Sequence, residues 1–307
     1  MTLIILGLDA LDAAQVKHYD IDGFQLNSYG EMETFAHQNP IPHTGEVWPS
    51  VATGLHPSEH GITHGGESKW DNVLVEYASR VVGPYISMHR RADLGRLIRR
   101  FTGADWEINE TNEPTFFDGE GRHVHNWPGT VNGNIVRRIW RHINHTVEKG
   151  SPQQDFDRDL CGEEAQKFAW VEELLNFNTV LVATHIHLLD ASGHAYGRNK
   201  DHYRSFYQKA ADYIHKIKKK MDDDDELLLL SDHGMNCEWL ENDYEICHHS
   251  FRAYSASTLD SRPESVFEVK EWVEDHIGTH ERKYGRRKEE TDLDMPEDTL
   301  RELGYIE

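Results

Sequence analysis

Residues 3–9 of the chain read LIILGLD, an uninterrupted apolar run that ends at an aspartate. A run without polar interruptions is typical of a strand that is buried on both faces, as parallel strands covered by helices are. Two further stretches are also predicted as strands: Thr179–Leu189, which is rich in β-branched and apolar residues and is followed by an aspartate, and the apolar run Leu227–Leu230, which is followed by Ser-Asp. Ligands of open parallel sheets gather at the carboxyl ends of the strands. The three runs therefore predict a parallel sheet with carboxylates along one edge.

Helical patterns alternate with these strands. Glu46–Leu55 contains Gly54 near its end, where glycine favours termination, and Asp201–Met221 repeats apolar and aromatic residues at spacings of three and four. The other predicted elements are helices at Glu163–Phe177 and Glu264–His276 and a strand at Ala253–Thr258. This alternation predicts an α/β fold in which a doubly wound, mostly parallel sheet is sandwiched by helices.

The length of 307 residues suffices for one large domain with a proper core. No internal repeat is visible, so residues 1–307 are predicted to form a single domain. Residues 66–160 carry many turn signals and only two helical patterns, Arg90–Phe101 and Asn134–Val147. We interpret 66–160 as an insertion or cap over the core.

Composition restricts the possible partners. The 54 acidic and 32 basic residues give a net charge of −22, which disfavours binding to nucleic acid or to anionic membranes. No apolar run is long enough to span a membrane, and no secretion signal is recognised, so a cytoplasmic location is expected. The three cysteines lack the spacing of a disulfide framework or a structural zinc site. An acidic protein that handles phosphate needs a local positive centre, which bound metal ions can supply.

Aspartates and histidines with the spacing of metal ligands follow the later strands. Asp190 and His194 are four residues apart, which places them on one face of a helical turn. Asp232 and His233 are adjacent just past a buried strand, and a pair of histidines at 248–249 can supply a third imidazole. One such aspartate is explained as well by helix capping, but three at strand ends, two of them near a histidine, favour a zinc or manganese site.

Thr44 lies at the start of the short helix, where the backbone N–H groups and the helix dipole favour an anion. A threonine hydroxyl is a poor nucleophile until a metal ion favours its alkoxide form. The segment alone is equally compatible with Thr44 as a simple N-cap. His185 and His187 form a His-X-His pair that can bind metal, but on a strand they share one face while Asp190 falls on the other, so we interpret them as structural.

The segment that begins at Thr44 resembles the signature of the alkaline phosphatase superfamily, in the branch near type I phosphodiesterases and nucleotide pyrophosphatases. In that signature a nucleophilic Thr or Ser is followed nine and ten residues later by Thr-Gly, and then by Pro and His-Gly-Ile. The chain keeps this spacing with Thr53-Gly54, Pro57 and His60-Gly61-Ile62. The remaining motifs follow in family order: Asp9, Asp190 with His194, Asp232-His233-Gly234, and a late histidine.

The resemblance implies an alkaline phosphatase-like fold and a metal-dependent hydrolase of phosphate esters, either a phosphomonoesterase or a phosphodiesterase. It implies a covalent phosphothreonine intermediate at Thr44 and two divalent cations, zinc first and manganese as the alternative. One cation is expected on Asp190, His194 and His249, with His248 as the alternative to His249. The other is expected on Asp9, Asp232 and His233, with the Thr44 hydroxyl as a further ligand.

Two positions depart from the family pattern. Gly65 stands where nucleotide pyrophosphatases carry an asparagine that holds a phosphate oxygen, and Glu46 stands where a proline is usual. The phosphate oxygen is therefore expected to meet backbone N–H groups near Gly45, a metal ion or Arg252. A phosphorylated small molecule is the expected substrate, and the sequence does not indicate an oligomeric state. The alternatives are a phosphotransferase or mutase, a sulfatase-like hydrolase of the same fold, and a non-catalytic protein that binds a phosphorylated ligand.

Overall fold

The computed structural model describes residues 2–62, 109–131, 150, 152–241, 245–277, 301 and 304. The predicted helices Arg90–Phe101 and Asn134–Val147 lie outside the described residues. Among the helices in the described ranges, none has both the length and the apolar character needed to cross a membrane.

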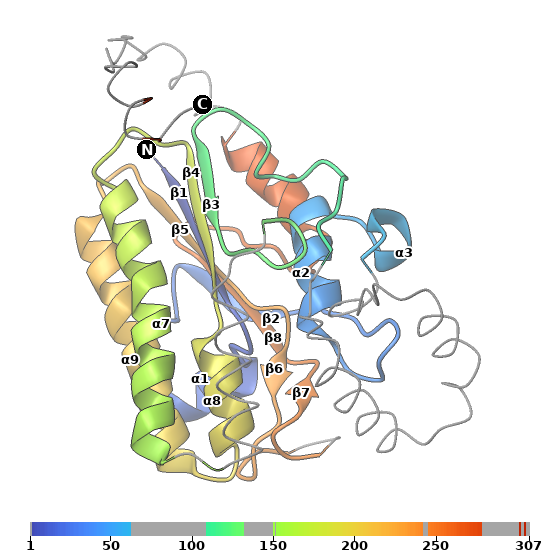
Figure 1. The fold of residues 1–307 in the computed structure, drawn as a ribbon, viewed down its shortest axis with the longest axis vertical. Coiled ribbons are helices and arrows are strands. Elements are labelled where there is room, and N and C mark those ends of the chain that lie inside the picture. Colours follow the sequence, from blue (N-terminus) through green and yellow to red (C-terminus); the bar gives the residue numbers. More distant parts are fainter. Residues whose placement is uncertain are drawn as a thin grey trace.

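The centre of the molecule is a six-stranded sheet in the order β2-β8-β5-β1-β4-β3 (Figure 1). Its strands are β1 (Leu3–Leu8), β2 (Ser28–Met32), β3 (Arg122–His125), β4 (Leu181–Ile186), β5 (Glu226–Leu230) and β8 (Ala253–Ser257). Strands β3, β4, β1 and β5 run parallel, and β8 is antiparallel to its neighbours β5 and β2. A separate antiparallel pair consists of β6 (Gly234–Met235) and β7 (His249–Ser250). The predicted α/β fold with a mostly parallel sheet is confirmed.

Helices cover both faces of the sheet (Figure 1). The helices on one face are α1 (Ala13–Tyr19), α7 (Gln153–Leu174), α8 (Leu188–Tyr196) and α9 (Lys200–Lys220). The other face carries α2 (Thr44–Thr53), with α3 (Pro57–His60) beside it, and a helical segment at 269–277. The sheet is therefore the middle layer of three.

The alternation of side chains along β1 builds both layers of the core. Ile4, Leu6 and Leu8 pack toward α9, whereas Leu3 and Ile5 pack toward α2. Each of these side chains is 3% exposed or less, and burial of such a side chain contributes about 1.5–3 kcal/mol. Any residue larger than glycine at position 7 would collide with the Trp48 ring, because a Cβ atom there would lie 2.9 Å from Trp48 Cη2. Gly7 thus allows helix α2 to approach the central strand.

Several predicted boundaries are wrong. The helix predicted at Glu264–His276, for example, covers only 269–277. The run Thr179–Leu189 is not one strand: β4 ends at Ile186 and α8 begins at Leu188. Leu188 and Leu189 are fully buried, and an apolar pattern alone does not separate a buried strand from a buried helix. Helix α7 begins at Gln153, ten residues before the predicted start. Its first turns are mostly polar and are followed by Gly162, so the sequence pattern did not reveal them.

The described part of the range 66–160 belongs to the core. Strand β3 extends the central sheet beside β4, Trp127 is fully buried in the layer of α2, and α7 already begins at Gln153. The described parts of 66–160 thus contribute a strand and a helix to the central domain, and the rest of the predicted insertion lies outside the described residues.

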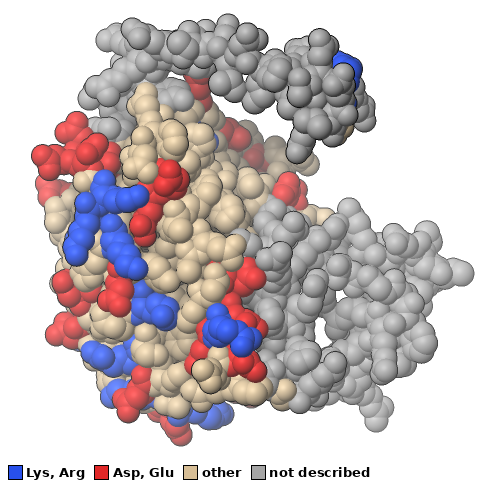
Figure 2. Space-filling model, turned by 60° about the vertical axis from the view of Figure 1, so that its left-hand side comes forward, with Lys and Arg blue, Asp and Glu red and all other residues tan. Residues whose placement is uncertain are grey.

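Charges of both signs are interspersed on the side of the molecule where α7 and α9 lie (Figure 2). The last turn of α9 carries Lys218, Lys219 and Lys220, and acidic residues 222–225 follow it directly. The described part of this face thus has no large area of a single charge sign, which is the usual condition of a solvated surface.

His60 holds the segment that contains helix α2. Its Nδ1 atom accepts a hydrogen bond from the backbone N–H of Ile62 at 3.2 Å, so Nε2 carries the proton and donates to the Ser50 hydroxyl at 3.0 Å. The Ser50 hydroxyl donates in turn to the carbonyl of Glu46 within α2. Burial lowers the pKa of His60 to about 4, and the neutral ring fits these contacts.

The lowered pKa of His60 predicts a loss of stability in acid. The unfolded chain binds a proton near pH 6.5 and the folded chain only near pH 4, so the contribution is complete above pH 6.5 and falls as the pH drops toward 4. Urea unfolding at pH 7 and pH 5 is expected to show about 2 kcal/mol more acid destabilisation for the wild type than for His60→Gln. An identical pH dependence for both proteins would contradict this role.

Candidate metal centre

Three neighbouring strands bring polar side chains to one edge of the sheet. Asp9 follows β1, Asp232 and His233 follow β5, and Asp190 with His194 lies on α8, just after β4. Strands β4, β1 and β5 are adjacent and parallel, so their carboxyl ends meet. Asp9, Asp232 and His233 are fully buried there. The structure thus brings these widely separated residues together.

The first set of ligand atoms is the Asp190 group, formed by Asp190, His194 and His249. Oδ1 of Asp190 lies 3.3 Å from Nε2 of each histidine, and the two Nε2 atoms are 3.2 Å apart. The opposite ring nitrogen, Nδ1, faces a backbone carbonyl at 2.8 Å: Cys247 O for His194 and Pro42 O for His249. A carbonyl oxygen only accepts hydrogen bonds, so Nδ1 of each ring carries the proton.

When the two rings are neutral, this tautomer leaves a lone pair on Nε2 of each, and both lone pairs converge with a carboxylate oxygen on one point. Converging lone pairs repel each other unless a cation lies between them. Tetrahedral zinc sites have metal–ligand distances of about 2.0–2.1 Å, which puts neighbouring ligand atoms about 3.3 Å apart. The spacing within the Asp190 group matches that value, and backbone carbonyls are usual outer partners of metal-binding histidines. The group therefore fits a divalent cation.

The second set is the Asp9 group, formed by Asp9, Asp232 and His233, with Thr44 beside it. Nε2 of His233 lies 3.1 Å from Asp9 Oδ1, 3.3 Å from Asp232 Oδ2 and 3.3 Å from the Thr44 hydroxyl. Nδ1 of His233 donates to the carbonyl of Gly234 at 2.9 Å, so Nε2 carries the lone pair whenever this ring is neutral. The Asp9 group has the same construction as the Asp190 group.

The electrostatics of the Asp9 group also fit a cation. Among the described residues, neither carboxylate oxygen of Asp232 has a hydrogen-bond partner, and burial together with the Asp9 carboxylate raises the pKa of Asp232 well above its usual range. Burial disfavours a charged His233, but the carboxylates of Asp232 and Asp9 outweigh it and raise its pKa to about 10. His233 faces both carboxylates, and a divalent cation in the group would balance them.

The two groups are adjacent. Nε2 of His233 lies 3.9 Å from Oδ1 of Asp190, and the rings of His233 and His249 stack with their centroids 3.7 Å apart. Cations in both groups would be close neighbours, as in two-metal sites whose ions lie about 4 Å apart.

Thr44 is not the N-cap of helix α2. His43 occupies that position, and its Nδ1 atom accepts the backbone N–H of Gly45 at 3.2 Å. The Thr44 hydroxyl instead lies 3.4 Å from Asp9 Oδ1, within the Asp9 group. The N–H of Gly45, one of the expected phosphate contacts, is directed to His43 in this structure.

The adjacent histidines 248 and 249 differ in the exposure of their side chains. The His248 side chain is 52% exposed, and its only described partner is Glu245 at 3.5 Å. The His249 side chain is 13% exposed and belongs to the Asp190 group. The β6–β7 pair turns position 249 inward, so the geometry favours His249 as the ligand.

Sequence reasoning missed two neighbours of Asp9. Oδ2 of Asp9 lies 3.2 Å from Nε2 of His185 and 2.6 Å from Nδ1 of His187, and both histidines are buried. His187 lies past the end of β4 rather than on it, so it does not follow the alternation of the strand. The signal that could have found it is a histidine three residues before Asp190 at a strand end.

Arg252 is the other expected substrate contact, but its guanidinium binds groups of the protein. It pairs with both carboxylate oxygens of Asp12 at 3.0–3.1 Å and reaches the carbonyl of Met235 and the side chain of Asn236. Asp12 also accepts hydrogen bonds from the Met235 N–H and the Ser250 hydroxyl. In this structure Arg252 therefore ties the β6–β7 pair to the start of α1, and these contacts do not support a role in substrate binding.

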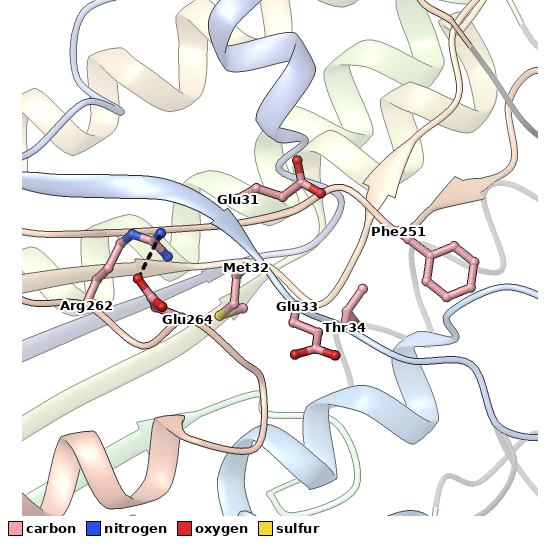
Figure 3. A pocket seen from close by; sticks show the side chains of 7 residues that line it. All are labelled: Glu31, Met32, Glu33, Thr34, Phe251, Arg262 and Glu264. Carbon is pink, nitrogen blue, oxygen red and sulfur yellow. Dashed lines mark ion pairs between the residues drawn. The ribbon is translucent and has the colours of Figure 1, made fainter.

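A groove of about 490 Å³ lies at the end of β2 (Figure 3). It is lined by Glu31, Met32, Glu33, Thr34, Phe251, Arg262 and Glu264. Thr34 links it to the site, because its hydroxyl donates to the backbone carbonyl of Asp232 at 2.6 Å. The ligand groups themselves do not line this groove, whose one positive side chain, Arg262, lies 3.7 Å from Glu264.

Comparison with known families decides the affiliation of the chain. The sequence model of the type I phosphodiesterase/nucleotide pyrophosphatase family matches residues 3–251. The chain belongs to this family. The match begins at β1 and ends just after β7, so it contains both ligand groups, and it confirms the resemblance carried by the segment that begins at Thr44. A search of curated protein sequences gives no match.

Solved structures with a similar fold include the PH0037 protein from Pyrococcus horikoshii. It is 14% identical with a TM-score of 0.50, and the alignment covers 95% of this chain and 98% of that chain. For the alkaline phosphatase from the Antarctic bacterium TAB5 the identity is 11%, the TM-score 0.46, and the coverage 90% and 98%. For murine ectonucleotide pyrophosphatase/phosphodiesterase 5 these values are 14%, 0.39, and 77% and 58%. At such identities the likeness concerns the fold alone.

The contrast between the two adjacent histidines predicts a difference in metal content. Protein purified without chelator is expected to carry about two transition-metal ions per chain by inductively coupled plasma mass spectrometry. His249→Ala should lose about one of them, because the Asp190 group then keeps only two ligands. His248→Ala is the matched control and should keep both, whereas loss of metal in His248→Ala alone would contradict the assignment.

Proposed function

We propose that the chain is a two-metal hydrolase of phosphate esters with Thr44 as its nucleophile. The observation that carries this proposal is the place of the Thr44 hydroxyl, 3.3 Å from His233 and 3.4 Å from Asp9, inside a group of buried ligand atoms. Membership in the type I phosphodiesterase/nucleotide pyrophosphatase family supports phosphate-ester chemistry at this position. Phosphorylated small molecules are the proposed substrates.

Thr44 needs activation that Asp9 does not supply as a base. Burial raises the pKa of Asp9, but the neighbouring His187, His185 and His233 outweigh it and hold that pKa well below its usual range. Asp9 therefore stays ionised and does not take the hydroxyl proton at neutral pH. A divalent cation in the Asp9 group would favour the alkoxide form of the hydroxyl, and one in the Asp190 group would neutralise the leaving oxygen.

The chain's own residues then orient the reaction. Helix α2 directs its N-terminal end, with its partial positive charge, to the position of Thr44, which favours a bound phosphate. Attack of the Thr44 oxygen on phosphorus would displace the alcohol and leave a phosphoryl group on the threonine. Attack of water on this phosphothreonine would release phosphate, or a phosphomonoester from a diester, and restore the hydroxyl.

The donor set limits the metals. Imidazole nitrogens and carboxylate oxygens in roughly tetrahedral spacing suit zinc first and manganese as the alternative. The Asp190 group supplies one carboxylate and two imidazoles, and the Asp9 group supplies two carboxylates and one imidazole. The second group is more anionic and should favour the harder ion when both metals are offered.

Replacement of Thr44 tests the nucleophile. With zinc or manganese added, Thr44→Ala is expected to lower the turnover of p-nitrophenyl phosphate and of bis-p-nitrophenyl phosphate by about 10³-fold or more. Thr44→Ser keeps a hydroxyl and should retain substantial activity and an acid-stable phosphoprotein after quenching. The preferred ester separates a monoesterase from a diesterase. Undiminished turnover in Thr44→Ala would refute a covalent mechanism at this residue.

A further inference from the structure

We propose that His187 is a positioning residue that fixes the separation of the two cation sites by bridging Asp9 and Asp190. Nδ1 of His187 lies 2.6 Å from Oδ2 of Asp9, and Nε2 lies 3.0 Å from Oδ2 of Asp190. One rigid imidazole ring therefore contacts one carboxylate from each ligand group. This inference rests on the proposed function, because it concerns the spacing of the two cations.

In each bridged carboxylate, one oxygen faces a ligand histidine and the other faces His187. Asp9 turns Oδ1 to His233 and Oδ2 to His187, and Asp190 turns Oδ1 to His194 and Oδ2 to His187. The ligand oxygens of both groups thus lie on one side of the carboxylates and His187 on the other. Loss of the ring would leave both carboxylates free to rotate away from their ligand positions.

The distances distinguish a bridge from a third set of ligands. Asp9, His185 and His187 also bring three donor atoms together. Ligand atoms around a tetrahedral metal are separated by about 3.3 Å, whereas charge-assisted N–H···O contacts measure about 2.7–2.9 Å. The 2.6 Å between Nδ1 of His187 and Oδ2 of Asp9 is shorter than both of these distances and lies nearer to the second. Of the two histidines, His187 alone has a described contact with Asp190, so it is the one that connects the groups.

Helix α7 holds the backbone of His187 through a hydrogen bond. The N–H of His187 donates to Oε2 of Glu164 on α7 at 2.8 Å. Glu164 forms an ion pair with Lys167 at 2.8 Å, and both side chains are fully buried. Because Lys167 holds the Glu164 carboxylate inside the protein, that carboxylate stays beside the His187 N–H. Helix α7 therefore fixes the junction between β4 and α8, from which His187, Asp190 and His194 project.

Three variants separate the two halves of the bridge. His187→Asn keeps a donor near the Nδ1 position, His187→Gln keeps one that can extend toward Asp190, and His187→Ala removes both. His248→Ala serves as the control, because this exposed side chain lies outside both ligand groups. Thermal unfolding monitored on each protein separates a folding defect from a local one, and the Asn and Gln variants serve if the Ala variant does not fold.

The test is electron paramagnetic resonance of the manganese-loaded proteins, beside metal content and kinetics. Wild type and His248→Ala should bind about two ions in a spin-coupled pair. His187→Ala should still bind two ions but with altered coupling, and kcat should fall about 10–100-fold with little change in KM. The Asn or Gln variant should restore part of the coupling and part of kcat.

Two results would overturn the bridge. Coupling and kcat equal to wild type in His187→Ala would exclude positioning, and loss of a third ion from a three-ion wild type would make His187 a ligand instead. A wild type without metal or turnover would refute the proposed function itself, and the proposal for His187 would fall with it. Failure of the bridge alone leaves the wild-type metal pair and its activity intact, so the two failures are distinguishable.

Discussion

Three buried carboxylates, those of Asp9, Asp190 and Asp232, lie together at the carboxyl edge of the sheet. Burial of an ionised carboxylate is costly unless positive charge lies beside it. The three imidazoles of the ligand groups lie beside these carboxylates and supply that charge only when they are protonated. Each donates Nδ1–H to a backbone carbonyl and turns its other nitrogen to a carboxylate. The three carboxylates therefore need positive charge that neutral side chains around them do not provide.

The rest of the fold brings these side chains together. Strand β1 is central because it pairs with β4 and β5 at once, and Gly7 lets Trp48 lie against it. Trp48 is fully buried on α2, and its carbonyl accepts the indole N–H of Trp127 at 3.2 Å. These contacts hold the first turn of α2, and with it Thr44, over the end of β1. The β6–β7 pair, tied to the start of α1 through Asp12 and Arg252, contributes His249 from the other side.

The central layer was predictable from sequence because a strand buried on both faces leaves an unbroken apolar run, as in Leu3–Leu8. Strands β2 and β3 were not predicted, since their sequences SYGEM and RHVH are polar edge strands that face solvent on one side. The family signature located Thr44 and the ligand candidates. It could not assign His187, whose role arises from a turn between strand and helix, nor the pairing of Arg252 with Asp12, which depends on contacts between distant segments.

The central claim is that the Asp190 group and the Asp9 group each hold a divalent cation. Anomalous diffraction from crystals grown with zinc, measured above and below the zinc absorption edge, tests it most directly. The account predicts two peaks about 4 Å apart, one among the atoms of each group, with the second beside the Thr44 hydroxyl. The absence of both peaks, or a single peak between Asp9, His185 and His187, would contradict it.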